Sequence, residues 1–285
     1  MNIYPISTGN FKLDGGAMFG VVPKSLWSRN IEADENNLCN WAMRCMLIED
    51  GDRLTLIDTG IGDKQSEKFF SHYYLNGDDS LDKSLQALGF NRDDITDVFL
   101  THLHFDHVGG AVEYNSDKTK LSPVFKNAKY WSNANHWKWA TEPNPREKAS
   151  FMKENILPIQ ESGQLEFVDV PGNGFLENSP LGFDVFFADG HTDKQMIPII
   201  DYKGKKIAFA ADLLPSAYHI PLPYVMGYDV RPLVTMDEKT TFLNKAVEEE
   251  IYIFLEHDAV NELCTVKQTE KGIRLDQTHN FSDIF

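Results

Sequence analysis

Apolar segments separated by short polar turns recur along the chain, and three pairs of them predict β-hairpins. Each pair is joined by three polar residues that include glycine, a pattern typical of antiparallel strands. The pairs are residues 44–49 with 53–58, residues 197–202 with 206–211, and residues 264–269 with 273–277. A further strand is expected at residues 165–169. These segments indicate a chain with substantial sheet.

Other stretches have helical composition and lie between the predicted strands. Four helices are expected, at residues 80–88, 133–141, 145–155 and 237–250. Gly89 ends the first of them, and Asp237 is a candidate N-cap for the last. The alternation of strands and helices predicts a mixed α/β fold.

The composition sets limits on size, compartment and partners. With 285 residues, 42% of them apolar, the chain can bury one large core, so that one sandwich domain is as plausible as two small ones. We adopt a single domain over residues 1–285 as the prediction. No run reaches the roughly 18 apolar residues that span a bilayer. Three cysteines and no secretion signal favour a cytoplasmic protein without a disulfide framework. The net charge of −16 disfavours nucleic acid as a partner.

One polar motif follows directly on the apolar run at residues 98–100. In residues 102–107, three imidazoles and a carboxylate occur at His102, His104, Asp106 and His107. These groups are ligands for zinc, iron and manganese. In an extended chain His102 and His104 share a face and can bind one ion, whereas Asp106 and His107 lie beyond the turn and can reach a second. The alternative is a solvated histidine-rich loop.

Further candidate ligands stand where later apolar runs end. They are His191 after residues 183–190, Asp212 after 207–211, and His257 after 251–256. Each alone has an ordinary interpretation as a polar residue at a strand end. Together with the histidine motif they indicate that strand ends gather distant side chains into one metal site.

These motifs, in this order, resemble the metallo-β-lactamase superfamily of binuclear hydrolases. The stretch from Gly15 to Trp27 and the segment Ala211-Asp212-Leu213-Leu214-Pro215 are similar to the branch of N-acyl homoserine lactonases and methyl parathion hydrolase. The resemblance covers about residues 13–258 and implies a four-layer αββα sandwich. It also implies two divalent ions, with zinc the leading choice and manganese, iron or cobalt as alternatives.

The resemblance assigns a role to each ligand. His102, His104 and His191 would hold one ion, Asp106, His107 and His257 the other, and Asp212 would bridge them. Such a pair makes hydroxide available near neutral pH for attack on an ester or lactone carbonyl. Asp106 or Asp212 would pass a proton to the leaving oxygen. Asp58 resembles the acid that orients a ligand histidine, although a turn-forming role before Thr-Gly is the alternative.

The segment after Asp212 departs from the related lactonases. They place a tyrosine three residues after the bridging aspartate, whereas this chain has Pro215, which offers no side-chain donor. Tyr218 or His219 could donate to the substrate oxygen instead, or both could simply pack in the loop. Aromatic residues such as Phe105 could line an apolar pocket, although core packing is the commoner role.

The sequence therefore predicts a metal-dependent hydrolase of ester bonds, most specifically a quorum-quenching N-acyl homoserine lactonase. A glyoxalase II-like thioesterase and an organophosphate triester hydrolase are alternatives, and a metal-binding scaffold is the non-enzyme alternative. A β-lactamase with a cysteine ligand is disfavoured because Cys264 comes too late. The expected partner is a small-molecule ester or lactone, without membrane or nucleic acid, and with a homodimer as an option.

Overall fold

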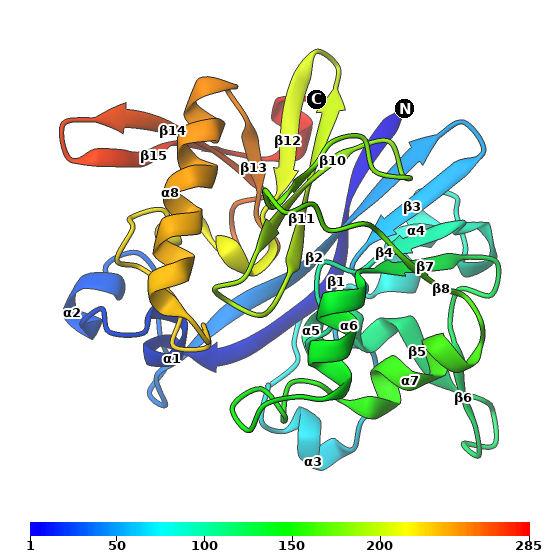
Figure 1. The fold of residues 1–285 in the computed structure, drawn as a ribbon. Helices are drawn as coiled ribbons and strands as arrows, with labels where there is room; N and C mark the ends of the chain where they lie inside the picture. Colours follow the sequence, from blue (N-terminus) through cyan, green and yellow to red (C-terminus); the bar gives the residue numbers. More distant parts are fainter. The chain divides into compact units, whose positions relative to one another are not determined.

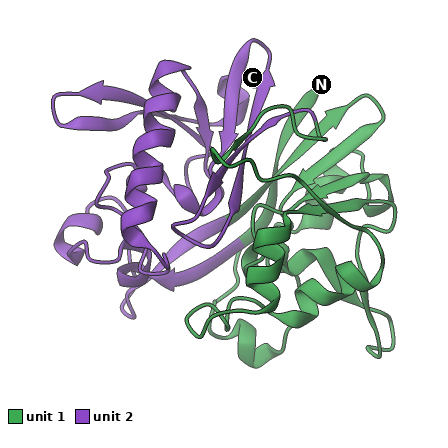
Figure 2. Cartoon of the chain, viewed as in Figure 1, with its two compact units in different colours: residues 1–9, 43–181 green, residues 10–42, 182–285 purple.

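The computed structural model describes residues 1–285 and contains two compact units (Figure 2). Unit 1 comprises residues 1–9 and 43–181, and unit 2 comprises residues 10–42 and 182–285. The chain passes from one unit to the other within two long strands, β1 (Asn2–Asp14) and β2 (Leu38–Asp50). The single domain expected over residues 1–285 stays a prediction.

A six-stranded sheet with the order β1-β2-β3-β4-β7-β8 forms the framework of unit 1 (Figure 1). Its remaining strands are β3 (Arg53–Ile57), β4 (Asp97–Phe99), β7 (Lys129–Ser132) and β8 (Leu165–Phe167). These four run parallel to one another, so their carboxyl ends meet at one edge. The Asp58 N–H donates to the Phe99 carbonyl at 3.0 Å, which places the residues that follow β3 and β4 side by side at that edge.

Short helices and one small hairpin complete unit 1. They are α3 (Glu67–Phe70), α4 (Leu81–Ala87), α5 (Phe105–Val108), α6 (Ala134–Thr141) and α7 (Lys153–Glu161), with β5 (Val112–Tyr114) and β6 (Leu121–Pro123). Two 3-10 turns cover Arg92–Asp94 and Gly109–Ala111. The Ser80 and Asn133 side chains cap α4 and α6, as their residue types favour. The helices predicted at 80–88 and 133–141 are therefore confirmed within a residue or two.

The helix predicted at 145–155 is wrong over most of its length. The Asn144 side chain accepts from the backbone N–H groups of Arg146 and Glu147, which ties this segment into a turn. The helix found nearby, α7, begins only at Lys153. Local hydrogen bonds from asparagine thus outcompeted the helical composition.

A seven-stranded sheet with the order β15-β14-β13-β12-β11-β10-β9 contains most strands of unit 2. Its strands are β9 (Phe175–Leu176), β10 (Asp184–Ala188), β11 (Gln195–Tyr202), β12 (Lys205–Phe209), β13 (Tyr252–Phe254), β14 (Leu263–Thr269) and β15 (Gly272–His279). The registers confirm the two hairpins predicted here, as they confirm the β2–β3 hairpin of unit 1.

The long helix α8 (Pro232–Glu248) lies across the sheet of unit 2 (Figure 1). It begins five residues before the predicted start because Pro232 occupies its first turn, where the fixed φ of proline fits. Asp237 is therefore inside the helix and is not its cap. Unit 2 also contains α1 (Gly15–Phe19), α2 (Lys24–Trp27) and 3-10 turns at Ala211–Leu213, Ala217–His219 and Phe281–Asp283.

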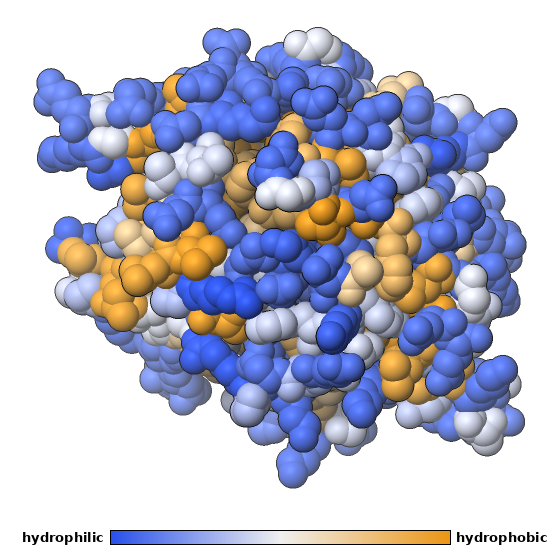
Figure 3. All heavy atoms as spheres, viewed as in Figure 1, coloured by the Kyte–Doolittle hydropathy of each residue, from blue (hydrophilic) through white to orange (hydrophobic).

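Each unit thus pairs a sheet with helices, the mixed architecture that the sequence pattern predicts. An apolar area lies on the surface of unit 2 over α2 and the start of α8 (Figure 3). Leu26 on α2, Leu233 at the start of α8 and Val21, which precedes α2 in the chain, are exposed apolar residues. None of the helices combines the length and the apolar character needed to cross a membrane.

Candidate metal centre

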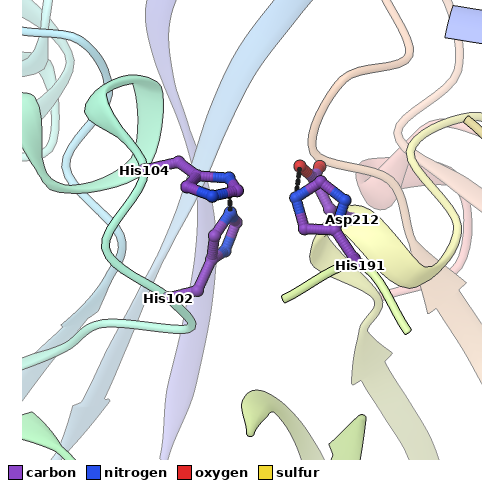
Figure 4. A group of neighbouring side chains, drawn as sticks. All are labelled: His102, His104, His191 and Asp212. Carbon is purple, nitrogen blue, oxygen red and sulfur yellow. Dashed lines mark hydrogen bonds and ion pairs between the residues drawn. The ribbon is translucent and has the colours of Figure 1, made fainter. Parts of the chain in front are cut away.

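The histidine motif of unit 1 begins where β4 ends. His102 and His104 lie two residues apart in extended backbone, and their Nε2 and Nδ1 atoms face each other at 3.1 Å (Figure 4). Both rings are buried. Two imidazole nitrogens at this separation either share a proton or direct their lone pairs toward one cation. The geometry agrees with the expectation that these two histidines bind the same ion.

Asp106 and His107 lie on the single turn of α5, beyond the bend after His104. The His107 Nε2 atom lies 3.7 Å from an Asp106 carboxylate oxygen, and both side chains are buried. Asp106 and His107 thus lie beyond the bend, as the spacing of the motif predicts, while the ring centroid of His107 stays 3.9 Å from that of His102.

Asp58 contacts the other ring nitrogen of His107, Nδ1. Its carboxylate lies 3.0 Å from His107 Nδ1 and accepts from the Thr101 N–H at 2.8 Å and the Thr101 hydroxyl at 2.6 Å. The residue is fully buried and has a φ of 57°, in the left-handed region that aspartate tolerates. Asp58 thus combines both expected roles, because it turns the chain and orients a candidate ligand so that Nε2 points away.

The glycines after the motif allow a close backbone approach. A Cβ atom on Gly109 would lie 2.1 Å from the Ile61 carbonyl oxygen. The amine of Lys64 donates to the Gly109 carbonyl, and burial lowers the pKa of this lysine to about 8. The loop that follows Asp58 and the loop that follows His107 therefore pack backbone against backbone.

Two residues that sequence reasoning did not select also hold the histidine loop. The His136 Nε2 atom, from α6, accepts from the Leu103 N–H at 2.9 Å, between the two candidate ligands. The buried Glu147 carboxylate lies 3.4 Å from His104 Nε2 and accepts from the Trp139 indole N–H at 2.7 Å. Because these partners are distant in sequence, no local pattern could have identified them.

In unit 2, Asp212 directs one carboxylate oxygen toward each of two histidines. Its Oδ2 lies 3.0 Å from His191 Nε2, and its Oδ1 lies 3.0 Å from His257 Nε2. Figure 4 shows the His191 contact. All three side chains are buried. The structure therefore brings together the three downstream residues that the sequence selected.

The outer nitrogens of these two histidines are held by other groups. His191 Nδ1 lies 3.0 Å from the Asp229 carboxylate, and His257 Nδ1 lies 2.8 Å from the Ala42 carbonyl oxygen. Burial opposes a charged His191, but Asp212 and then Asp229 outweigh it and raise its pKa to about 10. A cation binding at Nε2 would thus displace a proton. Asp229 is a further partner that the sequence analysis missed.

His219 and Tyr218, the two candidates for contacting the substrate, differ in their surroundings. The His219 ring is buried, its Nε2 donates to the Met18 carbonyl at 2.9 Å, and its Nδ1 accepts from the Ser216 hydroxyl at 2.8 Å. Both of its nitrogens are thus occupied within unit 2. The half-buried Tyr218 makes no side-chain hydrogen bond within the chain. The Tyr218 hydroxyl is therefore not engaged by another group of the chain, whereas both His219 nitrogens are.

A buried lysine fixes the loop that carries these residues. The Lys239 amine, on α8, donates to the carbonyl oxygens of His219 at 2.5 Å, Tyr224 at 2.9 Å and Pro221 at 3.1 Å. Burial lowers its pKa to about 7. Pro215, three residues after Asp212, thus leads into a loop whose carbonyl groups are hydrogen-bonded to Lys239 of α8.

The donors have the chemistry of a divalent-metal site. Buried histidine and aspartate side chains are grouped so that they could hold a metal ion, and most of the histidines have their outer nitrogen held by a carboxylate or carbonyl. This is how proteins orient imidazole ligands, so the residues fit the metal that the sequence motif implies.

The model of the metallo-beta-lactamase superfamily matches residues 44–251 of the chain. The chain belongs to the metallo-beta-lactamase superfamily. Among curated proteins, N-acyl homoserine lactonases of Bacillus thuringiensis, including AiiA of subspecies kurstaki, are 26% identical over 238 residues. The match covers 78% of this chain and 88% of theirs. These relatives are consistent with the lactonase branch that the sequence resembles.

Solved structures of similar proteins share the fold. A probable metal-dependent hydrolase from Staphylococcus aureus is 28% identical, with a TM-score of 0.83 and coverage of 97% of this chain and 95% of that chain. AidC, a dizinc quorum-quenching lactonase, is 21% identical with a TM-score of 0.75, covering 98% and 95%. At that identity AidC supports the fold alone. The predicted metallo-β-lactamase fold class is confirmed.

Proposed function

We propose that the chain is a binuclear metal-dependent hydrolase that opens the ring of N-acyl homoserine lactones and thereby quenches quorum signals. Membership of the superfamily supports a hydrolase. The observation that carries the proposal is Asp212, whose two oxygens each face a histidine Nε2 at 3.0 Å. A carboxylate placed in this way suits a bridge between two cations. The lactonase relatives supply the substrate class.

All seven candidate ligands take part in this proposal. His102, His104 and His191 would hold one ion, Asp106, His107 and His257 the second, and Asp212 both. When bound, divalent ions lower the pKa of water and polarise a carbonyl oxygen. Zinc fits the imidazole-rich set, with manganese, iron and cobalt as alternatives.

The side chains of the protein then handle the proton and orient the lactone. Opening the ring adds the oxygen of a water molecule to the carbonyl carbon and breaks the bond from that carbon to the ring oxygen, which must gain a proton. We assign this transfer to Asp106, because both oxygens of Asp212 already face histidines. Tyr218, whose hydroxyl has no partner within the chain, would donate to the lactone carbonyl oxygen.

Unit 1 also offers an apolar surface for an acyl chain. Phe105, the residue before Asp106, contacts Tyr73 and Phe69 with ring centroids 4.8 and 5.3 Å apart. Burial and the Asp106 charge raise the pKa of Tyr73 to about 12, so its ring stays neutral. Neutral aromatic rings beside a charged group suit a substrate with an apolar tail and a polar head.

A substrate panel on metal-loaded protein tests the proposal. It contains N-acyl homoserine lactones of several chain lengths, S-lactoylglutathione, a phosphotriester and a β-lactam, with ring opening followed by proton release. Asp212→Ala should lower lactone turnover at least about a hundredfold through loss of the bridge. Asp201→Ala, which removes an exposed carboxylate from β11, is the matched control and should leave turnover unchanged.

Turnover of the thioester or the phosphotriester with inert lactones would replace the lactonase proposal by one of its alternatives. Absence of turnover on every substrate, by a protein that retains metal, would favour a binding scaffold. The homodimer and the cytoplasmic location stay predictions.

A further inference from the structure

Glu238, on the second turn of α8, is the acceptor for two adjacent backbone N–H groups just before His191. Its carboxylate accepts from the Asp189 N–H at 2.6 Å and from the Gly190 N–H at 3.0 Å. Both groups follow the end of β10, where the ladder to β11 provides no further acceptor. One side chain thus satisfies two successive donors of the turn that carries the ligand.

Arg231, just before α8, donates hydrogen bonds to the carbonyl groups of the Asp189–Gly190 turn. The Arg231 guanidinium donates to the Asp189 carbonyl at 2.6 Å and to the Asp193 carboxylate at 3.0 Å. The Arg231 backbone N–H donates to the Gly190 carbonyl at 2.8 Å. The turn is therefore held by both its N–H and its C=O groups, from residues 231–238.

The contact between the turn and α8 leaves no room for adjustment. A Cβ atom on Gly190 would lie 2.2 Å from the Thr235 hydroxyl oxygen and 2.4 Å from the Thr235 nitrogen. The backbone before His191 is thus pressed directly against the first turn of α8. A shift of the helix would be transmitted to the turn, and a shift of the turn would move the His191 ring relative to Asp212.

The carboxylate is kept at this position in spite of unfavourable surroundings. Burial raises the pKa of Glu238 to about 7, against the opposing effect of its two N–H donors. A residue needed only for helix packing would be less costly as an apolar side chain. The two hydrogen bonds to the Asp189 and Gly190 N–H groups give a physical reason for a carboxyl group at this partly buried position.

We propose that Glu238 is a positioning residue for His191: by holding the Asp189–Gly190 turn, it sets the affinity of the ion that His191 binds, although it touches no ligand. The proposal rests on the proposed function, since it concerns the same metal site. Replacing a group that orients a metal ligand without touching the metal commonly lowers metal affinity by about 10–100-fold. The effect should be confined to one of the two ions.

Glu238→Gln tests this with little change in shape. The amide retains one acceptor oxygen but turns an NH2 group toward the second backbone N–H, so that only one of the two hydrogen bonds can persist. Asp237→Asn is the matched control, since it removes a carboxylate from the adjacent, exposed position of the same helix. Glu238→Asp retains the charge on a shorter arm and should recover part of the affinity.

The readouts are zinc affinity, from competition with a chromophoric chelator, and the absorption spectrum of the cobalt-loaded protein. Glu238→Gln should weaken one of the two zinc-binding steps about tenfold or more and alter the cobalt bands, whereas Asp237→Asn should match wild type within about twofold. Urea unfolding of the metal-free proteins separates loss of fold from loss of positioning.

Wild-type zinc affinities and cobalt spectrum in Glu238→Gln would overturn the proposal, whether or not the metal-free variant is less stable. Equal weakening of both zinc steps, with loss of stability of the same size, would also overturn it. Wild-type protein that binds no zinc would instead refute the proposed function, so the two failures are distinguishable.

Discussion

Replacing His219 by alanine tests whether this residue has a structural role or the catalytic role that sequence reasoning suggested. The imidazole is buried and is stacked on Phe19, with ring centroids 4.5 Å apart and planes within 6°. It also makes two hydrogen bonds, to Met18 and Ser216. If these contacts are its function, the substitution should affect stability first.

The expected loss follows from those contacts. Each buried hydrogen bond contributes about 1 kcal/mol, and the stacked ring pair about 0.5–1.5 kcal/mol beyond its area. Truncation of a buried ring also leaves a cavity, so we expect a total loss of about 3–4 kcal/mol in unfolding free energy. Ser216→Ala, which removes only one of the hydrogen bonds, should cost about 1 kcal/mol.

Urea unfolding of the metal-free proteins measures these losses, and steady-state kinetics on metal-loaded protein provides the comparison. A loss below about 1 kcal/mol for His219→Ala, together with turnover at least about tenfold lower at full metal content, would refute this reasoning. His219 would then contact the substrate directly.

The same substitution should also remove a pH dependence. Burial lowers the pKa of His219 to about 3, so the unfolded chain binds this proton more readily than the folded one. Stability from this group is therefore present above pH about 6.5 and is lost as the pH falls toward 3. The gap between wild type and His219→Ala should narrow by about 1.6 kcal/mol between pH 6.5 and pH 5, because the slope reaches about 1.4 kcal/mol per pH unit only once the pH is below 6.5. A constant gap across this range would show that the ring is not buried in its neutral form.

Three further substitutions test other parts of the site. Asp58→Asn should weaken metal binding about 10–100-fold in chelator competition, because the amide cannot accept from both Thr101 and His107, and wild-type affinity would remove Asp58 from this role. Gly109→Ala should cost at least about 1–3 kcal/mol in urea unfolding, since its Cβ would overlap the Ile61 carbonyl, and an unchanged midpoint would contradict that contact. Tyr218→Phe should lower lactone turnover about tenfold or more with metal content unchanged, and equal turnover would leave the carbonyl oxygen without this donor.

Features carried by neighbouring residues could be predicted from sequence. The three hairpins follow from local alternation and glycine-containing turns, and the β11–β12 register closes at Tyr202 and Lys205, as the pattern indicates. The histidine motif likewise forms a compact loop, because its donors are separated by one or two residues. Asp58 was found because its position before Thr-Gly matched a family pattern.

The carboxylates that contact the outer nitrogens of the candidate ligand histidines could not be predicted in this way. Glu147 and Asp229 lie 43 and 38 residues from the histidines they contact, and neither stands in a recognisable motif. Glu147 was instead placed within a predicted helix, since composition cannot reveal that Asn144 turns the chain. His219 was selected for its closeness to Asp212 in sequence, which carries no information about burial.

The number of metal ions per chain tests the central claim most directly. Seven buried donors exceed what one four-coordinate ion can use, and Asp212 directs an oxygen to each of two histidines. Elemental analysis of folded protein, after dialysis against zinc and removal of excess, should give about two ions per chain. One ion or none in that preparation would contradict the binuclear account.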